Sequence, residues 1–515
     1  MLVVVQESNR PAVSATAILL LAIPWLNPLT YGPTHPVVQS LIVWIAAALC
    51  WLTWELAQVD RPTRIRAIAA AWMAAATASA AMGLLQYLGL AEHFSPFINY
   101  VEAGQAYANL RQRNQLATLL AIGLAALLWW QARAAGRAPS PSEGRSPALS
   151  ALFAMLALLL VAADAASGSR TGLLQLLLLL ALSLIWKQGR ITLLLAVLGY
   201  AAAAIVLPHL AGLDPLHSGI LGRVGEAGDP CASRLTLWSN VLHLIAHKPW
   251  LGWGWGELDY AHFITLYEGP RFCEILGNAH NLPLHLAVEL GIPFALVVCG
   301  ALLWLVLRAK PWSEQDATRQ MAWSVLGVIG LHSMLEYPLW YAPFQLAALL
   351  ALWLLWQTRH SKSEITVAST STGRSLAVSP VAVVSLLITA CAYVGWDYWR
   401  ISQIYLPVSD RAAAYRDDTL DKAHGSWLFA DQVKFAELGV TLLTQENAAH
   451  VHALALDMLH FSPEQKVAEK LIESAQVLGN LEEAVYFGQR YQAAFPQEYA
   501  LWKQTQVSGA SDEAP

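Results

Sequence analysis

The chain has 515 residues, of which 56% are hydrophobic and only 13% are charged, and its mean hydropathy is +0.44. Because a soluble domain usually has about 25% charged residues, this composition excludes an ordinary soluble protein and indicates a polytopic membrane protein. The net charge of −5 is small for this length and gives no indication of nucleic-acid binding.

Apolar runs recur along the chain, and a spanning helix needs about 20 mostly apolar residues. No Ala-x-Ala type cleavage site follows the first run, so we interpret it as a retained helix rather than a signal peptide. The sequence therefore predicts an all-α, polytopic membrane helical bundle with about eleven or twelve transmembrane helices. The predicted spans are 12–30, 37–58, 67–90, 114–132, 148–166, 171–186, 191–208, 282–307, 320–337, 340–357 and 378–396.

The positive charges between these spans predict the orientation. Basic residues follow every second span, and the positive-inside rule places such loops, and with them the N-terminus, in the cytoplasm. The long loop 209–279 and everything after about residue 397 are then outside. Three more arginines also lie on the outer side, where the positive-inside rule does not account for a positive charge: Arg111, Arg113 and Arg170. The basic residues on the inner side are Arg61, Arg64, Arg66, Arg133, Arg137, Arg145, Lys187, Arg190, Arg308, Lys310, Arg319, Arg359, Lys362 and Arg374.

The outer parts of the chain predict a separate domain and a cross-link. Residues 398–505 mix polar and apolar positions at helical spacing, which predicts a small helical domain of tetratricopeptide-like hairpins, followed by a disordered tail at 506–515. The membrane domain is then 1–397. Cys231 and Cys273 both lie in the outer loop, where they either form a disulfide or remain two free thiols.

Two polar residues stand where the outer loop meets the eighth span. Asn281 is a good helix cap, and Pro283 is tolerated in a first helical turn. His280 precedes them, and histidine can act as a general base near neutral pH. The alternative is that His280 is only a polar residue at the membrane surface.

Arg170 lies in the sequence Ser-Gly-Ser-Arg-Thr-Gly between two apolar spans. An arginine at membrane depth is costly unless it is paired or lines a wet cavity. Its planar guanidinium suits phosphate. We therefore favour a phosphate-binding role over an arginine that merely marks the turn at the interface.

The outer loop contains another arginine and a Gly-Trp motif. Arg234 stands at the start of an expected amphipathic helix, and Leu-Gly-Trp-Gly-Trp-Gly follows that helix. The glycines could let the backbone approach a ligand, or a sugar ring could stack on Trp253 or Trp255. The spacing by itself favours an interfacial turn anchored by tryptophan.

Histidine and glutamate occur four residues apart twice, as His285 with Glu289 and as His332 with Glu336. Each pair shares one helix face. The pattern predicts buried polar pairs that orient helices, and an ionisable residue in a membrane is also a candidate for function.

Several motifs follow one another in a fixed order: Gln86–Gly89, Arg113–Ala117, Ser169–Gly172, Arg234–Trp238 with Pro249–Gly254, His280–Gly291 and His332–Tyr341. With the long outer loop before the His-Asn motif, this order resembles the O-antigen ligase/polymerase superfamily over most of the chain. Within it, the last motif and the helical tail are more similar to the bacterial protein O-oligosaccharyltransferases of the PglL type than to lipopolysaccharide ligases.

The resemblance implies a glycosyltransferase that needs no metal, nucleotide or other cofactor. Its donor would be a glycan preassembled on undecaprenyl diphosphate, at the periplasmic face of the bacterial inner membrane. His280 would activate the acceptor hydroxyl, and Arg170 and Arg234 would hold the diphosphate and stabilise the departing charge. Arg113 would add to this anionic site. The residues expected to support the site are Asn114, Asn281, Glu289, Glu336, Trp253 and Trp255.

The expected reaction is transfer of the whole oligosaccharide to Ser or Thr of periplasmic proteins such as pilin. A first alternative changes only the acceptor, as in a lipid A–core ligase or a polymerase of the glycan; the outer helical domain favours a protein. A second alternative is a transporter of the lipid-linked glycan, which would place its polar residues at mid-membrane. The candidates here cluster instead on the outer face.

Overall fold

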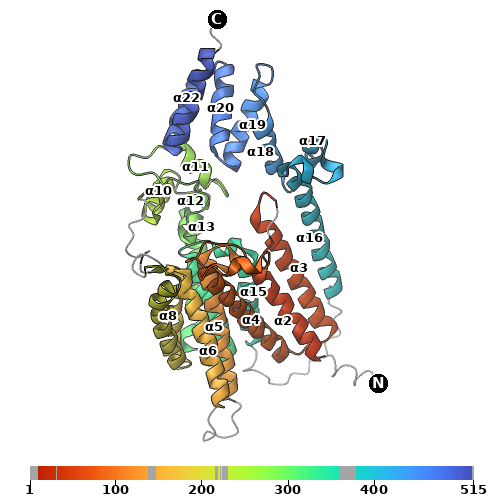
Figure 1. Ribbon diagram of the computed structural model, residues 1–515, viewed down its shortest axis with the longest axis vertical. Helices are drawn as coiled ribbons and strands as arrows, with labels where there is room; N and C mark the ends of the chain where they lie inside the picture. Colours follow the sequence, from red (N-terminus) through yellow and green to blue (C-terminus); the bar gives the residue numbers. More distant parts are fainter. Residues whose placement is uncertain are drawn as a thin grey trace. The chain divides into compact units, whose positions relative to one another are not determined.

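The computed structural model describes residues 10–29, 32–136, 146–214, 219, 220, 222, 230–359 and 379–512. All regular structure in these ranges is helical, which confirms the predicted all-α class (Figure 1). Ten of the predicted spans each correspond to one helix. These helices are α2 (Arg10–Leu26), α3 (His35–Leu56), α4 (Arg61–Tyr87), α5 (Arg113–Ala135), α6 (Pro147–Ser167), α7 (Arg170–Trp186), α8 (Arg190–Leu210), α14 (Ala317–Ser333), α15 (Ala342–Gln357) and α16 (Pro380–Ser402).

The remaining predicted span, 282–307, is wrong as a single helix. Helix α12 (Leu282–Leu290) ends at Gly291, and α13 (Ile292–Ala309) begins directly after it. Gly291 has φ +86°, and a Cβ atom there would overlap the main-chain carbonyl of Trp250. Since glycine is common inside membrane helices, the apolar pattern does not reveal this break. Pro293, which has no N–H to donate to the Glu289 carbonyl, and the close approach of the Trp250 main chain both act at this break.

Seven helices in the described ranges are long and apolar enough to cross a membrane: α3, α4, α5, α6, α8, α13 and α16. Three further apolar helices, α2, α7 and α15, are shorter. The chain is therefore a multi-pass membrane protein.

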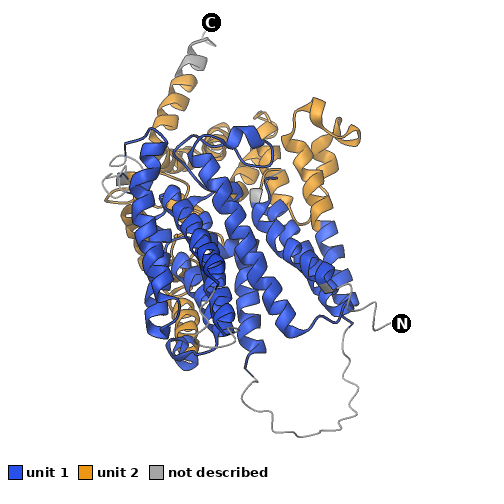
Figure 2. Cartoon of the chain, turned by 60° about the horizontal axis from the view of Figure 1, so that its bottom comes forward, with its two compact units in different colours: residues 1–30, 35–226, 306–393 blue, residues 31–34, 227–305, 394–515 orange. Residues whose placement is uncertain are grey.

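The chain divides into two compact units (Figure 2). Unit 1 consists of Met1–Thr30, His35–Glu226 and Val306–Tyr393, and unit 2 of Tyr31–Thr34, Ala227–Leu305 and Val394–Pro515.

Helix α5 forms the centre of unit 1. In its most apolar stretch 83% of the residues are buried, and it packs against α4, α6, α7 and α14. The approach of α4 is close because Gly123 of α5 faces Ala76 with no room for a Cβ atom. Small residues at such contacts are typical of membrane helix packing.

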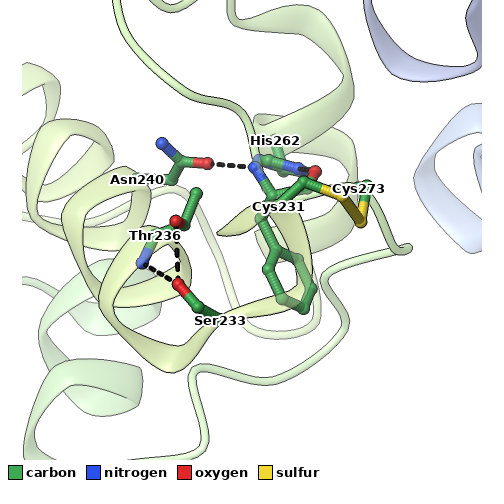
Figure 3. Close-up of a disulfide and its surroundings, with 7 residues drawn as sticks. Cys231, Ser233, Thr236, Asn240, His262 and Cys273 are labelled. Atoms are coloured by element: carbon green, nitrogen blue, oxygen red, sulfur yellow. Dashed lines mark hydrogen bonds between the residues drawn. A yellow bond between two sulfur atoms is a disulfide. The ribbon is translucent and has the colours of Figure 1, made fainter. Parts of the chain in front are cut away.

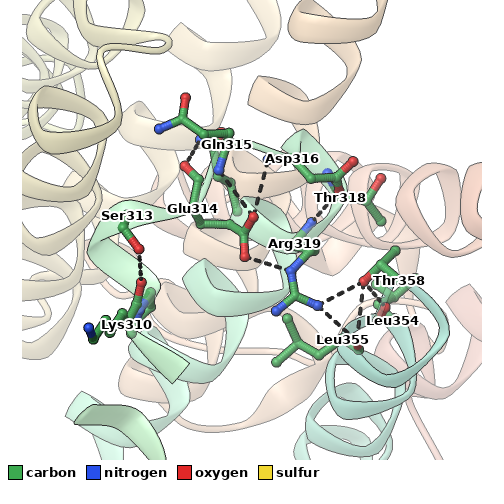
Figure 4. Close-up of polar contacts among 12 residues, drawn as sticks. Lys310, Ser313, Glu314, Gln315, Asp316, Thr318, Arg319, Leu354, Leu355 and Thr358 are labelled. Atoms are coloured by element: carbon green, nitrogen blue, oxygen red, sulfur yellow. Dashed lines mark hydrogen bonds and ion pairs between the residues drawn. The ribbon is translucent and has the colours of Figure 1, made fainter. Parts of the chain in front are cut away.

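The start of α14 is fixed to the end of α15 (Figure 4). Asp316 caps α14 by accepting the N–H of Arg319 at 3.0 Å. The Arg319 side chain donates to Glu314 at 2.5 Å, to the Leu355 carbonyl at 2.9 Å and to the Thr358 hydroxyl at 3.1 Å. Because the last carbonyls of a helix have no partner within it, this arginine satisfies one of them. Arg319, assigned to the inner side by charge, thus also joins two helices.

Unit 2 ends in five consecutive helices, in which α19 packs on α20, α20 on α21 and α21 on α22. Their shared core includes Val451, Leu471 and Tyr491, all fully buried. Helix α22 is the last of them and extends to Asp512, and 513–515 lie outside the described residues. The helices are α18 (Ala430–Val440), α19 (Ala448–Phe461), α20 (Gln465–Val477), α21 (Leu481–Ala494) and α22 (Pro496–Asp512).

Candidate active site

The main chain at His280 is held on both sides in an unusual conformation. His280 has φ +50°, in the left-handed region that non-glycine residues seldom adopt. Its N–H donates to the Asn278 side chain at 2.9 Å, and the preceding carbonyl, of Ala279, accepts from the Trp238 indole at 3.1 Å. The His280 side chain is half-buried. Backbone strain of this kind persists only where the surroundings enforce it, and it is often found at functional sites.

Asn281 caps helix α12, as its residue type predicts. Its side-chain oxygen accepts the N–H of Leu284 at 3.1 Å, and Pro283 occupies the first turn. The cap fixes the direction in which the chain leaves His280, so the two asparagines flanking the histidine set its position from both ends.

One turn into α12, His285 and Glu289 form a buried pair, with Nε2 and Oε2 3.6 Å apart. Burial, with a smaller contribution from the charge of His280, lowers the pKa of His285 to about 4. Burial also raises the pKa of Glu289 to about 7. Burial therefore favours the uncharged form of each group. This agrees with the structural role expected for the pair. Among the described residues, no group of three or more His, Cys, Asp or Glu side chains is arranged to hold a metal ion.

The Glu289 carboxyl leads to a pH-dependent prediction. Its pKa is raised in the folded protein, so the folded state holds a proton that the unfolded chain releases above its ordinary pKa of 4.5. This contribution to stability is present below pH 4.5 and is lost as the pH rises through 7. Glu289→Gln, which mimics the neutral form, should therefore gain thermal stability relative to wild type between pH 5 and pH 8. Melting curves of both proteins at each pH measure the difference; a constant difference would contradict the buried neutral carboxyl.

The Gly-Trp motif packs against the end of α12. The N–H groups of Trp253 and Gly254 donate to the carbonyls of Val288 and Glu289, both at 2.9 Å. Gly252 has φ +70° and no space for a Cβ atom beside Glu289. The glycines thus permit a close backbone approach, as the sequence suggested, but the partner is a helix end rather than a ligand.

The two tryptophans of this motif differ in their surroundings. The Trp253 indole donates to the Leu244 carbonyl at 3.0 Å, and the Lys248 ammonium lies 4.0 Å from its ring centroid. Trp255 is 63% exposed, and its ring centroid is 6.0 Å from that of His285. Of the two, Trp255 is the one with an open face on which an apolar or sugar ring could stack.

A disulfide joins the start of helix α10 (Arg234–His247) to the segment that leads to His280 (Figure 3). The Cα atoms of Cys231 and Cys273 are 5.3 Å apart, and the Cys273 N–H donates to the Cys231 carbonyl at 3.3 Å. A second link lies beside it, because the Phe272 N–H donates to Asn240 of α10 at 2.7 Å. The chain therefore has two fixed points shortly before the histidine.

In unit 1, a chain of hydrogen bonds connects the starts of α5 and α7. The Ser169 hydroxyl caps α7 by accepting the N–H of Gly172 at 3.0 Å, and it donates to the side-chain oxygen of Asn114 at 2.7 Å. The Asn114 amide in turn donates to Glu336 at 3.2 Å. These contacts bring the start of α7, which carries Arg170, beside the start of α5, which carries Arg113.

A second set of polar contacts lies one turn deeper in the same unit. The Thr118 hydroxyl lies 2.8 Å from Nδ1 of His332. The Gln175 side chain donates to the Thr118 hydroxyl at 2.7 Å and to the Val328 carbonyl at 3.0 Å. His332 and Glu336, expected to form a pair, bond to two different residues of α5, Thr118 and Asn114.

Each of the three candidate arginines is the first residue of its helix: Arg113 of α5, Arg170 of α7 and Arg234 of α10. A cation is unfavourable at this end, where the helix dipole is positive and N–H groups lack partners, unless an anion binds there. Arg61 and Arg190 also begin helices, but on the basic side that the charge pattern assigns to the cytoplasm. The Arg170 guanidinium is exposed and makes no hydrogen bond or ion pair within the described part of the chain.

Sequence reasoning missed two features of this region. The Ser-Arg pairs at 169–170 and 233–234 are both helix starts with the serine as cap, and serine before a helix was the available signal. Asp164 is a single acid in the apolar run of α6; it is buried, and the missing side chain of Gly172 leaves space for its carboxyl. A lone aspartate inside a predicted span was the available signal.

Three family models match parts of the chain. A model for O-antigen ligases matches residues 155–299, one for protein glycosylation ligases matches 106–130, and one for the C-terminal part of virulence factor membrane-bound polymerases matches 320–509. The three matches include Arg113, Arg170, Arg234, His280 and Glu336.

Curated relatives are similar over about half of the chain. A general O-oligosaccharyltransferase of Acinetobacter baylyi is 26% identical over 53% of this chain and 47% of its own length. A ComP-specific O-oligosaccharyltransferase of the same organism is 23% identical over 47% of this chain and 42% of its length. An O-antigen ligase of Pseudomonas aeruginosa is 27% identical over 61% of this chain and 67% of its own length. The matches thus span about half the length of the first two relatives. No solved structure matches the chain.

Proposed function

We propose that the chain is a protein O-oligosaccharyltransferase of the O-antigen ligase superfamily, whose models and members it matches in part. It transfers an oligosaccharide as a whole from undecaprenyl diphosphate to Ser or Thr hydroxyls of periplasmic proteins, pilin among them. It acts in the bacterial inner membrane, with its N-terminus in the cytoplasm and the His280 loop and the helical C-terminal domain in the periplasm. The reaction uses no metal or nucleotide.

The observation that carries this proposal is the position of His280. A half-buried histidine, held in a strained conformation between two hydrogen-bonded asparagines, is suited to act as a positioned base. Its imidazole accepts the proton of the acceptor hydroxyl as that oxygen bonds to the anomeric carbon of the glycan. The bond between the anomeric carbon and the diphosphate breaks at the same time, and the electron pair leaves with the lipid diphosphate.

The arginines supply the charge that the leaving group needs. The diphosphate gains negative charge as it departs, and guanidinium groups placed beforehand stabilise that charge. Arg170 and Arg113 begin neighbouring helices of unit 1, and the exposed Arg170 has no partner among the described residues. Arg234 begins a helix tied by the disulfide to the His280 segment. We assign all three to the diphosphate.

A test begins with intact-mass spectrometry of periplasmic and pilin proteins from cells with the gene, without it, and with it restored. The proposal expects a glycan mass on Ser or Thr that appears only when the gene is present. An unchanged protein profile in cells that express the gene and make a lipid-linked glycan would contradict it.

The second candidate keeps the chemistry and changes the acceptor. Similarity to an O-antigen ligase covers 67% of that relative, more than is covered in either oligosaccharyltransferase. In that case the same gene deletion would alter lipopolysaccharide or polymer length and leave protein masses unchanged.

A further inference from the structure

Unit 2 contains an open cavity of about 730 Å³ that no part of the proposed reaction uses. It lies between α18 and α20, and residues from outside these helices, among them Ile275, Tyr405 and Phe495, complete its walls. We call it the α18–α20 groove. Its volume is in the range of ligand-binding clefts.

The floor and one wall of the groove are apolar. Phe435, Leu438 and Val440 of α18 and Val467 of α20 line it. Leu438 and Val467 belong to the buried core, whereas Val440 is 67% exposed at the edge. An exposed apolar surface joined to a cleft is typical of a site that binds another chain.

The α20 side of the groove is charged, mostly with acids. Glu464, Glu469 and Glu473 line it together with Lys466 and Lys470. Residues 394–515 as a whole contain 17 Asp and Glu against 9 Lys and Arg.

Hydrogen bonds hold three of these side chains in place. Tyr491 donates to Glu469 at 2.7 Å, Trp502 donates to Glu473 at 3.0 Å, and Lys470 donates to the Thr441 carbonyl at 2.9 Å. A partner with basic groups complements this surface, because opposite charges across an interface favour association.

The groove is close to the proposed base along the chain. Ile275 stands two residues after the disulfide-bonded Cys273 and five residues before His280. Five residues span at most about 18 Å when fully extended. A segment of a protein that lies in the groove can therefore present a neighbouring hydroxyl to the histidine.

We propose that the α18–α20 groove binds the acceptor protein through a segment that is apolar in its centre and basic at its ends. This inference rests on the proposed transferase function and adds the place where the protein acceptor is recognised. The groove selects the protein, and the His280 segment selects the hydroxyl.

The test uses the full-length protein in detergent micelles and two fluorescein-labelled peptides. One is Lys-Leu-Phe-Ser-Ala-Phe-Lys, and the other has Glu in place of both Lys residues. Fluorescence anisotropy should show that the basic peptide binds more tightly than the acidic one. No measurable binding of the basic peptide below about 1 mM, or equal binding of the two peptides, would overturn the proposal.

Two pairs of variants separate the groove from general effects. Gly439 lines the groove, and a Cβ atom there meets no atom within 4 Å, so Gly439→Leu fills open space; Gly439→Ala is its control with a similar gain in helix propensity. Val440→Arg adds bulk and positive charge at the groove. Leu442→Arg is its control, because it adds the same group two residues away, at an 81% exposed side chain that does not line the groove. Gly439→Leu and Val440→Arg should each weaken basic-peptide binding about tenfold, and the two controls should not.

Each remaining outcome has one meaning. Equal losses in Leu442→Arg and Val440→Arg, or full binding in Gly439→Leu, overturn the groove as the site. Competition by free oligosaccharide released from the donor would make it a glycan site instead. His280→Ala should bind the peptide normally. If the wild-type protein binds the peptide but transfers no glycan, the proposed function is contradicted, and the groove remains a peptide-binding site.

Discussion

Replacement of His280 by Ala is expected to abolish glycan transfer while the protein still folds and inserts. A positioned general base contributes about 10² to 10⁴ in rate, and nothing else in the 278–281 segment can take up the proton of a hydroxyl. Because Asn278 and Asn281 hold the main chain through their own side chains, loss of the imidazole should leave the loop intact. Alanine also tolerates this left-handed conformation no better than histidine does, so a small loss of thermal stability is expected.

The measurement is the fraction of acceptor protein that carries the glycan, determined by intact mass in cells that produce equal amounts of each variant. His247→Ala is a matched control, because this histidine lies in unit 2 on an exposed position of α10. Transfer at the wild-type level by His280→Ala would remove the residue from the mechanism. A loss of equal size in His247→Ala would point to damage of the loop as a whole.

Arg170→Lys is expected to lower transfer about 10- to 100-fold although it keeps the positive charge. A guanidinium can donate two parallel hydrogen bonds to a phosphate, and an ammonium cannot. A charge-assisted hydrogen bond contributes about 1.5–3 kcal/mol, which corresponds to this range of rates. Since Ser169, and not the arginine, caps α7, the helix start should persist in the variant.

Arg190→Lys provides the control for this substitution. Arg190 is likewise the first residue of a helix in unit 1, and it is exposed, but the charge pattern places it on the inner side. Initial rates of transfer from purified lipid-linked glycan should fall only in the Arg170 variant. Near-normal rates for Arg170→Lys would mean that the arginine contributes charge or orientation alone.

The helices and their caps were predictable from local sequence. Apolar runs set the positions of the helices, because a backbone in lipid must satisfy its hydrogen bonds within one segment. Asn281 and Pro283 predicted the start of α12, and this helix begins at Leu282. The mixed polar and apolar spacing after residue 400 likewise indicated the helices that end the chain.

The roles of the candidate site residues remain predictions, but their surroundings are now defined. The sequence singled out Arg170 and Arg113 because the charge pattern did not explain them. It could not show that Asn114 bonds to both Ser169 and Glu336. In the chain, Ser169 lies 55 positions from Asn114, and Glu336 lies 222 positions from it. His332 and Glu336 each also bond to a residue of α5, which the sequence could not show.

The sequence by itself therefore determined the class of protein, the course of its helices and the residues whose chemistry is unusual for their position. The disulfide between Cys231 and Cys273, the helix end that contacts the Gly-Trp motif and the α18–α20 groove were decided by the tertiary structure. The reason is physical. Helix formation and membrane insertion depend on neighbouring residues, whereas each of these features depends on which distant segments pack together.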